Sequence, residues 1–276
     1  MSSRSPAQAA PAATPSFVVL IPARLASTRL PDKPLADIAG IPMVVRVANQ
    51  ARQSQAVRVA IATDSPRIAD VARAHGHEAI MTRTDHASGT ERLAEAITLM
   101  ELAEDTIVVN VQGDEPEIPP ALIDALASCL ASDLECPMAT AVHPVQSVAD
   151  WLNPNVVKVV ADAEERALLF SRAPLPWSRS HLAWGLDAGT PQARQAFEAA
   201  QPLRHIGMYA YRSRFLTRYA QLDPCALEDI EALEQLRVLH HGYRIKLLHT
   251  DDAPPAGVDT PADLERVRAR LGHGTH

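Results

Sequence analysis

Two loops in the first half of the sequence carry side chains that could bind a phosphorylated ligand. The first spans residues 22–35 (PARLASTRLPDKPL) and holds three cations and two hydroxyl groups: Arg24, Arg29, Lys33, Ser27 and Thr28. Arginine and lysine can neutralise a triphosphate, which carries about four negative charges near neutral pH. The loop contains no glycine, so side chains rather than backbone amides would hold the phosphates. A solvent-exposed basic loop is the alternative, and charge spacing alone slightly favours it.

The second loop spans residues 109–120 (VNVQGDEPEIPP) and offers carboxylates. Gln112 and Asp114 follow an apolar run, Gly113 permits a sharp turn, and the prolines stiffen the exit. Mg²⁺ usually takes one or two protein carboxylates and completes its shell with phosphate oxygens. The loop is therefore a candidate magnesium site. An acidic turn that only faces solvent is an equally good interpretation of the loop alone.

These loops need a sheet that brings them together, and the hydrophobic pattern predicts one. From Phe17 onward, short β-branched runs alternate with helical patterns, which is typical of an α/β fold with a parallel sheet. The expected strands of the first half are residues 17–21, 57–63, 78–81 and 106–112. Ligands bind such sheets at the carboxyl ends of the strands, which is where both loops lie.

The second half of the chain has a different pattern. Strand-like segments separated by turn signals predict a mixed or antiparallel extension of the sheet: residues 137–145, 155–162, 167–172 and 203–212. Residues 174–202 contain Trp177, Trp184 and several prolines and are too long for an ordinary connection, so a mobile flap is predicted. A single helix is predicted over residues 227–240. Three of its glutamates recur at helical spacing, typical of a solvated face: Glu228, Glu231 and Glu234.

Composition narrows the class of protein. The 276 residues are 47% hydrophobic and carry a formal net charge of −7, which argues against a basic nucleic-acid binder. Three cysteines without a C-x-x-C pair favour a reduced cytoplasm. Residues 1–16 are mainly Ala, Pro and Ser and predict a disordered tail. The most apolar segment near the start, residues 17–21, is far too short to span a membrane.

A set of motifs in a fixed order makes the sequence resemble a known family. The blocks run from residue 21 to 267: IPARLASTRLPDKPL, ATDSPRI, HASGTERLAEA, NVQGDEPEIP, NPNVVKVV, LFSRAPLPW, HIGMYAYR, LEQLR and GVDTPADLERV. Together they resemble the 3-deoxy-manno-octulosonate (Kdo) cytidylyltransferases, also called CMP-Kdo synthetases. The resemblance implies a GT-A-like α/β fold over residues 17–276. A nucleotide-binding part is expected at about 17–135, and a sugar-binding and dimerisation part at about 136–250.

The resemblance also implies a reaction and a set of site residues. CMP would pass from CTP to Kdo with release of pyrophosphate, for lipopolysaccharide biosynthesis, in a homodimer that uses Mg²⁺. The metal carboxylates would be Asp114 and Asp259, with Arg24 and Lys33 as further catalytic residues. The CTP set would be Arg24, Ser27, Arg29, Lys33, Ala62, Thr63, Asp64, Ser88, Gly89 and Arg92. The Kdo set would be Gln112, Arg172, His205, Tyr209, Glu234 and Gln235.

Two positions depart from the family pattern, and two other functions stay open. Asp32 and Ile41 stand where family members usually have glycine and lysine, and the Asp32 carboxylate would weaken triphosphate affinity. His205 and the glutamates would be assigned structural roles without the resemblance. A cytidylyltransferase or glycosyltransferase for another sugar on the same fold is one alternative. A non-catalytic sugar-nucleotide-binding module is the other, although it has no evident need for both Asp114 and Asp259.

Overall fold

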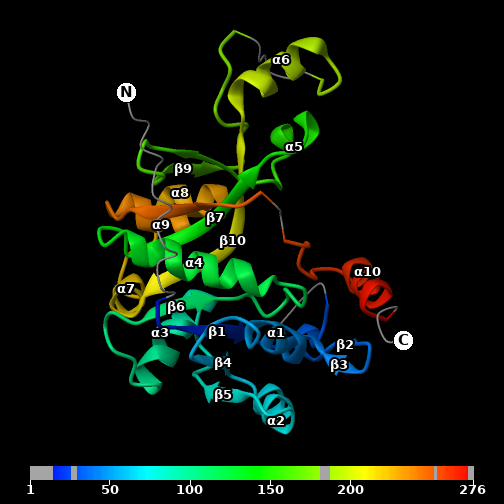
Figure 1. The fold of residues 1–276 in the computed structure, drawn as a ribbon, viewed down its shortest axis with the longest axis vertical. Coiled ribbons are helices and arrows are strands. Elements are labelled where there is room, and N and C mark those ends of the chain that lie inside the picture. Colours follow the sequence, from blue (N-terminus) through cyan, green and yellow to red (C-terminus); the bar gives the residue numbers. More distant parts are fainter. Residues whose placement is uncertain (1–14, 26–29, 181–186, 252–253, 273–276) are drawn as a thin grey trace, which may run out of the picture.

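A nine-stranded sheet forms the centre of the molecule, with helices on both faces (Figure 1). The computed structural model describes residues 15–25, 30–180, 187–251 and 254–272. The main strand order is β11-β7-β10-β6-β1-β4-β5, and β8 and β9 continue from β10. The predicted disordered tail lies almost entirely outside the described residues. Within the described ranges, no helix combines the length and the apolarity that crossing a membrane requires.

The first half of the chain builds the parallel part of the sheet. Its strands are β1 (Phe17–Ala23), β4 (Arg58–Thr63), β5 (Glu78–Met81) and β6 (Ile107–Asn110). β1 pairs in parallel with both β4 and β6, and β4 pairs in parallel with β5. Residues 17–21 and the whole of β6 are buried, as expected for apolar strands covered on both faces. The predicted parallel sheet is therefore confirmed.

The second half adds the mixed extension that the sequence predicts. Its strands are β7 (Met138–Pro144), β8 (Lys158–Ala161), β9 (Ala167–Ser171), β10 (Leu203–Arg212) and β11 (Ile245–His249). β10 lies antiparallel between β6 and β7, while β11 runs parallel to β7. β6 and β7 therefore end at the same edge of the sheet, where β10 begins. This arrangement brings the second half of the chain to the carboxyl edge of the parallel strands.

Each face of the sheet packs against its own group of helices. One core includes α1 (Met43–Ala51), α2 (Pro66–Ala74) and α4 (Pro120–Ser132). The other includes α3 (Gly89–Leu99), α7 (Ser213–Tyr219) and α9 (Gln235–His240). The helix α3 packs on β1 and α7, so its first turn lies near the end of β1. The segment that begins α3 and the loop after β1, which both belong to the predicted site, are therefore neighbours.

The C-terminal helix α10 (Pro261–Gly272) packs beside the short hairpin of β2 (Asp37–Ile38) and β3 (Ile41–Pro42). Val258, Leu264 and Val267 form an apolar cluster with Ile38 and Met43. The predicted capping box is confirmed, because the Asp263 carboxylate accepts from Thr260 N at 2.8 Å and Thr260 Oγ1 donates to it at 2.7 Å. This packing fixes the segment immediately before α10 against the first half of the chain.

The prediction of one helix over residues 227–240 was wrong. The chain forms α8 (Ala226–Glu231) and then α9, because Ala232 adopts a left-handed conformation with φ 49°. The predicted solvated face is also wrong for Glu228, which is buried and pairs with Arg237, whereas Leu227 and Ile230 are exposed. Helical spacing could not reveal this orientation, because the buried partners of the glutamates come from other parts of the fold.

The predicted flap contains a helix that the sequence interpretation missed. α6 (Pro191–Ala200) packs against α5 (Val148–Leu152), where Phe197 lies 6.0 Å from the fully buried Trp151. The Trp151 indole donates to the backbone oxygen of Leu175 at 2.9 Å. Trp177 is 41% exposed, and Trp184 lies outside the described residues. At least residues 191–200 are therefore an ordered helix rather than an irregular loop.

Candidate active site

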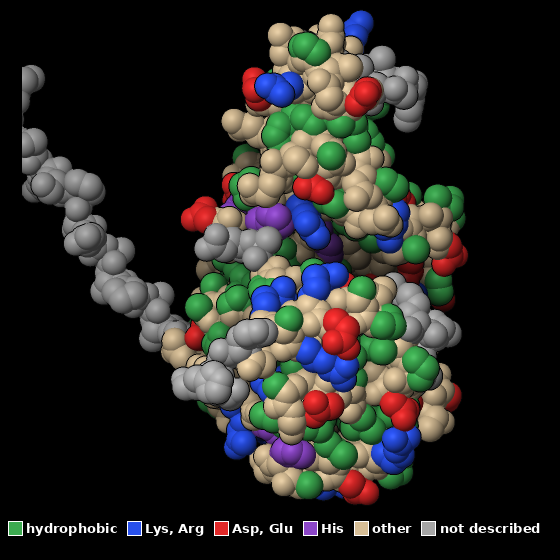
Figure 2. Space-filling model, turned by 90° about the vertical axis from the view of Figure 1, so that its right-hand side faces the viewer, with side chains coloured by type: hydrophobic (Ala, Val, Ile, Leu, Met, Phe, Trp, Pro, Cys, Tyr) green, Lys and Arg blue, Asp and Glu red, His purple; other side chains and the backbone are tan. Residues whose placement is uncertain are grey.

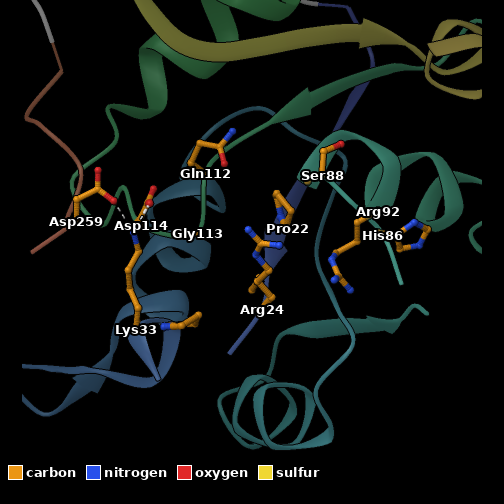
Figure 3. A pocket seen from close by; sticks show the side chains of 13 residues that line it. Pro22, Arg24, Lys33, His86, Ser88, Arg92, Gln112, Gly113, Asp114 and Asp259 are labelled. Atoms are coloured by element: carbon orange, nitrogen blue, oxygen red, sulfur yellow. Dashed lines mark hydrogen bonds and ion pairs between the residues drawn. The ribbon is translucent and has the colours of Figure 1, made fainter. Parts of the chain in front are cut away.

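A pocket of about 400 Å³ opens at the carboxyl edge of the sheet (Figure 3). The end of β1, the 3₁₀ turn η1 (Lys33–Leu35), the start of α3 and the turn after β6 all line it. Its polar lining residues are Arg24, Lys33, His86, Ser88, Arg92, Gln112, Asp114 and Asp259. Figure 2 shows this side of the molecule hollowed across its middle, with Lys and Arg side chains gathered along the lower rim.

Gly113 lets the turn after β6 lie directly against β1. A Cβ atom at this position would come within 2.9 Å of the backbone oxygen of Pro22, which real Cβ atoms essentially never do. The sequence interpretation gave Gly113 a role in turning the chain, but the structure assigns it this close backbone approach. The approach places Gln112 and Asp114 on either side of Gly113, at the wall of the pocket.

Lys33 joins the two carboxylates that come from opposite halves of the chain. Its Nζ donates to Asp114 Oδ2 at 2.6 Å and to Asp259 Oδ1 at 2.9 Å. The backbone N–H of Val258 donates to the backbone oxygen of Asp114 at 2.9 Å, which holds the segment of Asp259 in place. Burial lowers the pKa of Lys33, but the charges and hydrogen bonds of Asp114 and Asp259 outweigh burial and raise it above its usual value.

The donor set of this cluster fits a magnesium ion. Two carboxylate oxygens lie within hydrogen-bond distance of one nitrogen, so they can converge on one small cation. Asp114 is half-buried and Asp259 is exposed, so both can take further oxygen ligands. Burial, helped by the charge of Asp114, raises the pKa of Glu115 to about 8, so Glu115 is mostly neutral at pH 7. No group of three His, Cys, Asp or Glu residues suited to a metal occurs among the described residues.

Arg24 is the exposed cation of the pocket. Figure 3 shows its guanidinium between Lys33 and Pro22, pointing into the pocket. Lys33 is tied to two carboxylates, whereas no ion pair engages Arg24 within the described part of the chain. Ser27 and Arg29, also predicted to bind CTP, lie outside the described residues. Asp32 has φ 52°, a conformation that favours glycine, and its carboxylate lies 3.0 Å from Arg67 rather than towards the pocket.

Part of the predicted CTP set lies on the far side of the pocket from Lys33. Ser88, Gly89 and Arg92 line the pocket, but Ala62, Thr63 and Asp64 do not. Asp64 instead pairs with buried Arg92 at 2.8 Å and so helps to hold Arg92 in the pocket wall. His86, which the sequence interpretation passed over, also lines the pocket, with its Nε2 2.5 Å from Glu95 Oε2. His86 is the first residue of the block HASGTERLAEA, so the resemblance was the signal that could have found it.

Most of the predicted sugar residues gather beyond this pocket, around β10 and the start of α9. His205 lies 5.5 Å from the Tyr209 ring, and the charge of Glu234 contributes to raising the Tyr209 pKa, after burial. Glu234 accepts a hydrogen bond from Thr90 Oγ1 at 2.6 Å. Only Gln112 of the predicted Kdo set lines the pocket itself. The structure thus brings four of the six predicted Kdo residues together as a neighbouring cluster: His205, Tyr209, Glu234 and Gln235.

Two buried amides in this region have unsatisfied atoms. Gln235 is 2% exposed, and its Nε2 has no hydrogen-bond partner among the described residues; the same is true of Oδ1 of Asn110, which is 1% exposed. Asn110 is directly opposite Tyr209 in the sheet. Buried polar atoms normally find partners, so these two are candidates for contact with a polar ligand. Asn110 could have been singled out in the sequence, because it is the polar residue that ends the apolar run IVVN.

The Arg172 side chain is bound to backbone oxygens of the protein in this structure. Its guanidinium donates to the backbone oxygens of Glu231 at 2.6 Å and Pro154 at 3.0 Å. Fully buried Lys158 donates to three backbone oxygens, one of them that of Arg172 at 2.7 Å, and burial lowers the pKa of Lys158 to about 8. In this conformation Arg172 therefore ties β9 to α8, and its predicted contact with a sugar carboxylate stays a prediction.

His205 should make the stability of the protein pH-dependent. Burial lowers its pKa to about 3, and its Nε2 lies 3.0 Å from Thr140 Oγ1, so the ring is neutral in the folded state. The unfolded chain takes up this proton near the ordinary histidine pKa of 6.5, so stability is lost as pH falls from 6.5 towards 3. Between pH 7 and 5.5 the loss from this residue should be about 1 kcal/mol.

Urea unfolding of the wild type and of His205→Gln at these two pH values measures the effect. The Gln variant should lose less stability than the wild type on acidification. Exposed His240 offers a matched control, and His240→Gln should follow the wild type. An identical pH dependence for all three proteins would contradict the neutral, half-buried state of His205.

Comparisons with known proteins agree with the architecture. Residues 18–245 match the family model described as cytidylyltransferase. The 3-deoxy-manno-octulosonate cytidylyltransferase of Methylibium petroleiphilum is 58% identical over 93% of this chain and 95% of the relative. The enzyme of the same name from Acidovorax sp. is 57% identical over 93% of this chain and 97% of the relative.

Solved structures give the same result. A CMP:2-keto-3-deoxy-manno-octonic acid synthetase complexed with CTP superposes with a TM-score of 0.83 and 41% identity, covering 94% of this chain and 99% of the other. A 4-diphosphocytidyl-2C-methyl-D-erythritol synthase, at 14% identity and a TM-score of 0.58 over 93% and 98% of the chains, shares the fold alone. The chain belongs to the 3-deoxy-manno-octulosonate cytidylyltransferase family.

Proposed function

We propose that this chain transfers CMP from CTP to Kdo, releasing pyrophosphate, and so supplies activated Kdo for lipopolysaccharide biosynthesis. The observation that carries the proposal is the convergence of Asp114 and Asp259 on Lys33, beside Arg24, at the carboxyl edge of the sheet. The identity of 57–58% to two enzymes that bear this activity in their names supports the choice of substrates.

The reaction is a substitution at the α-phosphorus of CTP. A hydroxyl oxygen of the sugar forms a bond to phosphorus, the bond to the bridging oxygen of pyrophosphate breaks, and the hydroxyl proton leaves to solvent. Arg24 and Lys33 would neutralise the triphosphate, and the pocket walls would hold the reacting atoms in line. No covalent intermediate with the protein is needed, so the protein acts by positioning and by charge.

Asp114 and Asp259 are the residues that would hold Mg²⁺. Bound there, the ion would neutralise charge on the phosphate oxygens and make the phosphorus more electrophilic. The ammonium of Lys33 already lies between these carboxylates, so it can balance their charge before substrate binds and interact with phosphate afterwards. Together these residues place positive charge where the departing pyrophosphate develops negative charge.

A substrate panel tests the choice of sugar. Pyrophosphate release is measured with CTP, Mg²⁺ and a series of acid sugars, including Kdo and N-acetylneuraminate. We expect kcat/KM for Kdo to exceed that for every other sugar. A higher value for another acid sugar would replace the substrate, and the absence of turnover with every sugar, although CTP binds, would favour a non-catalytic binding module.

We also propose that the protein forms a homodimer through its sugar-binding half. Three large apolar side chains are exposed there: Leu168 on β9 is 61% exposed, and Leu227 and Ile230 on α8 are 42% and 80% exposed. The Arg172 guanidinium joins the end of β9 to α8, so these elements are neighbours. Exposed apolar groups on adjacent elements are typical of interfaces. The cytoplasmic location stays a prediction from composition.

Ile230→Asp should weaken this dimer, because a carboxylate would replace an apolar contact. We expect the dimer dissociation constant, measured by sedimentation equilibrium, to rise at least about tenfold. Val57 is 69% exposed on the segment leading into β4, so Val57→Asp is a matched control that should leave the constant unchanged. A wild-type protein that sediments as a monomer would contradict the dimer, and an unaltered Ile230→Asp dimer would exclude this surface.

A further inference from the structure

Thr90 connects the nucleotide pocket to the predicted sugar residues. It is the second residue of α3, directly after Ser88 and Gly89, which line the pocket. Thr90 is 1% exposed and does not line the pocket, and its Oγ1 donates to Glu234 Oε1 at 2.6 Å. A contact between residues so far apart in sequence joins the two halves of the site.

Glu234 needs such a partner because of where it lies. It sits between the short helices α8 and α9, two residues after the left-handed Ala232. Nearby Arg237 is already engaged by Glu228, with two hydrogen bonds of 2.7 Å. The Thr90 bond is the side-chain hydrogen bond that the structure gives to the Glu234 carboxylate within the described ranges. Without this hydroxyl, the carboxylate would lose both its fixed orientation and a donor.

A carboxylate oriented in this way keeps the capacity to bind a ligand. The two oxygens of Glu234 can together accept about four hydrogen bonds. Thr90 uses one of these positions, which leaves acceptor sites for sugar hydroxyls. Unpartnered Gln235 Nε2 is on the next residue and can donate. One acceptor and one donor on adjacent residues suit a polyhydroxylated acid.

We propose that Thr90 is a positioning residue that orients Glu234 for the acid sugar, so that recognition of the sugar depends on a hydroxyl group of the nucleotide-side helix. The inference rests on the proposed function and deepens it. Thr90 is not expected to touch either substrate. Its loss should therefore affect the use of the sugar through Glu234 and leave the use of CTP intact.

Kinetics of Thr90→Val test this inference, since valine keeps the shape and loses the hydroxyl. The KM for Kdo should rise about tenfold, the scale expected for losing a hydrogen bond to a charged group. The KM for CTP and kcat should stay within twofold, and Thr90→Ser should restore the KM for Kdo. Thr98 is exposed on the same helix, so Thr98→Val is a matched control that should leave all constants unchanged.

The pH profile separates orientation of the carboxylate from a general packing effect. Burial raises the Glu234 pKa, and the Thr90 hydrogen bond counteracts it, so Thr90→Val should raise that pKa further. The fall of kcat/KM for Kdo on acidification should therefore occur at higher pH in the variant. The titratable groups around Glu234 keep their identity in this comparison: Glu91, Glu228, Arg237, Tyr209, Tyr211 and Tyr219. Tyr211 also shares a hydrogen bond with the Thr90 side chain, so Tyr211→Phe is measured beside Thr90→Val and should leave the KM for Kdo unchanged.

A double-mutant cycle with Glu234→Gln completes the test. If Thr90 acts through Glu234, Thr90→Val should add less than twofold to the KM for Kdo in that background. An unchanged KM for Kdo in Thr90→Val, equal increases for CTP and Kdo, or fully additive effects would each overturn the positioning role while the proposed function stands. A wild-type protein without Kdo-dependent pyrophosphate release would instead overturn the proposed function, and this inference with it.

Discussion

Asp114→Asn should lower turnover with CTP and Kdo at least about tenfold, and Asp259→Asn should do the same. Each change removes one anionic oxygen from the pair that would hold Mg²⁺. The fold should survive, because the Asp114 and Asp259 side chains are 30% and 52% exposed and neither contributes to an apolar core. Steady-state rates over a range of Mg²⁺ concentrations measure the effect, and the variants should need more Mg²⁺ than the wild type.

Asp105→Asn is the matched control for these variants. Asp105 precedes β6 at the opposite end from Asp114, and its carboxylate pairs with Arg214 at the surface. Its replacement should leave turnover and the Mg²⁺ dependence unchanged. Near-wild-type turnover of either pocket variant at low Mg²⁺ would reject the assignment of that carboxylate to the metal.

Lys33→Met should lower kcat/KM for CTP about a hundredfold, the second large effect. The change removes the ammonium that lies between Asp114 and Asp259 and leaves two carboxylates facing each other. Mg²⁺ alone should therefore raise the melting temperature of Lys33→Met more than that of the wild type, because the ion would relieve this repulsion. Initial rates at varied CTP and thermal unfolding with and without Mg²⁺ measure the two effects.

Arg67→Met provides the control for a change of charge close to the same loop. Arg67 pairs with Asp32, the residue before Lys33, but both side chains are exposed and lie away from the pocket. Its kcat/KM for CTP should stay within threefold of the wild type. If Lys33→Met lowered kcat/KM for Kdo and left kcat/KM for CTP unchanged, Lys33 would act on the sugar rather than on the triphosphate, which would contradict its assignment.

The sequence was most informative where the chemistry is local. Apolar runs such as residues 17–21 predicted buried strands, and Thr260 with Asp263 predicted the start of α10, because both depend on neighbouring residues. The meeting of Asp114 and Asp259 could come only from the family resemblance. It depends on the packing of α10 against β2, which no local pattern encodes.

The errors in the sequence interpretation share a physical cause. Glu228 and Glu234 had helical spacing typical of a solvated face, yet their partners Arg237 and Thr90 hold them inside the protein. Local spacing cannot show a partner supplied by another element. For the same reason, local spacing could not show that Asp64 pairs with Arg92, and its predicted contact with CTP stays a prediction.

Phosphorus NMR of the complete reaction tests the central claim, that the pocket at the carboxyl edge transfers CMP to a sugar hydroxyl. With CTP, Mg²⁺ and Kdo, the three CTP resonances should give way to one phosphodiester resonance and that of pyrophosphate, in equimolar amounts of the two products. Neither product should form when Kdo is omitted, and Asp114→Asn should form at least about tenfold less of both over the same interval. Orthophosphate or free CMP as the main product, or pyrophosphate release that does not require the sugar, would contradict the account.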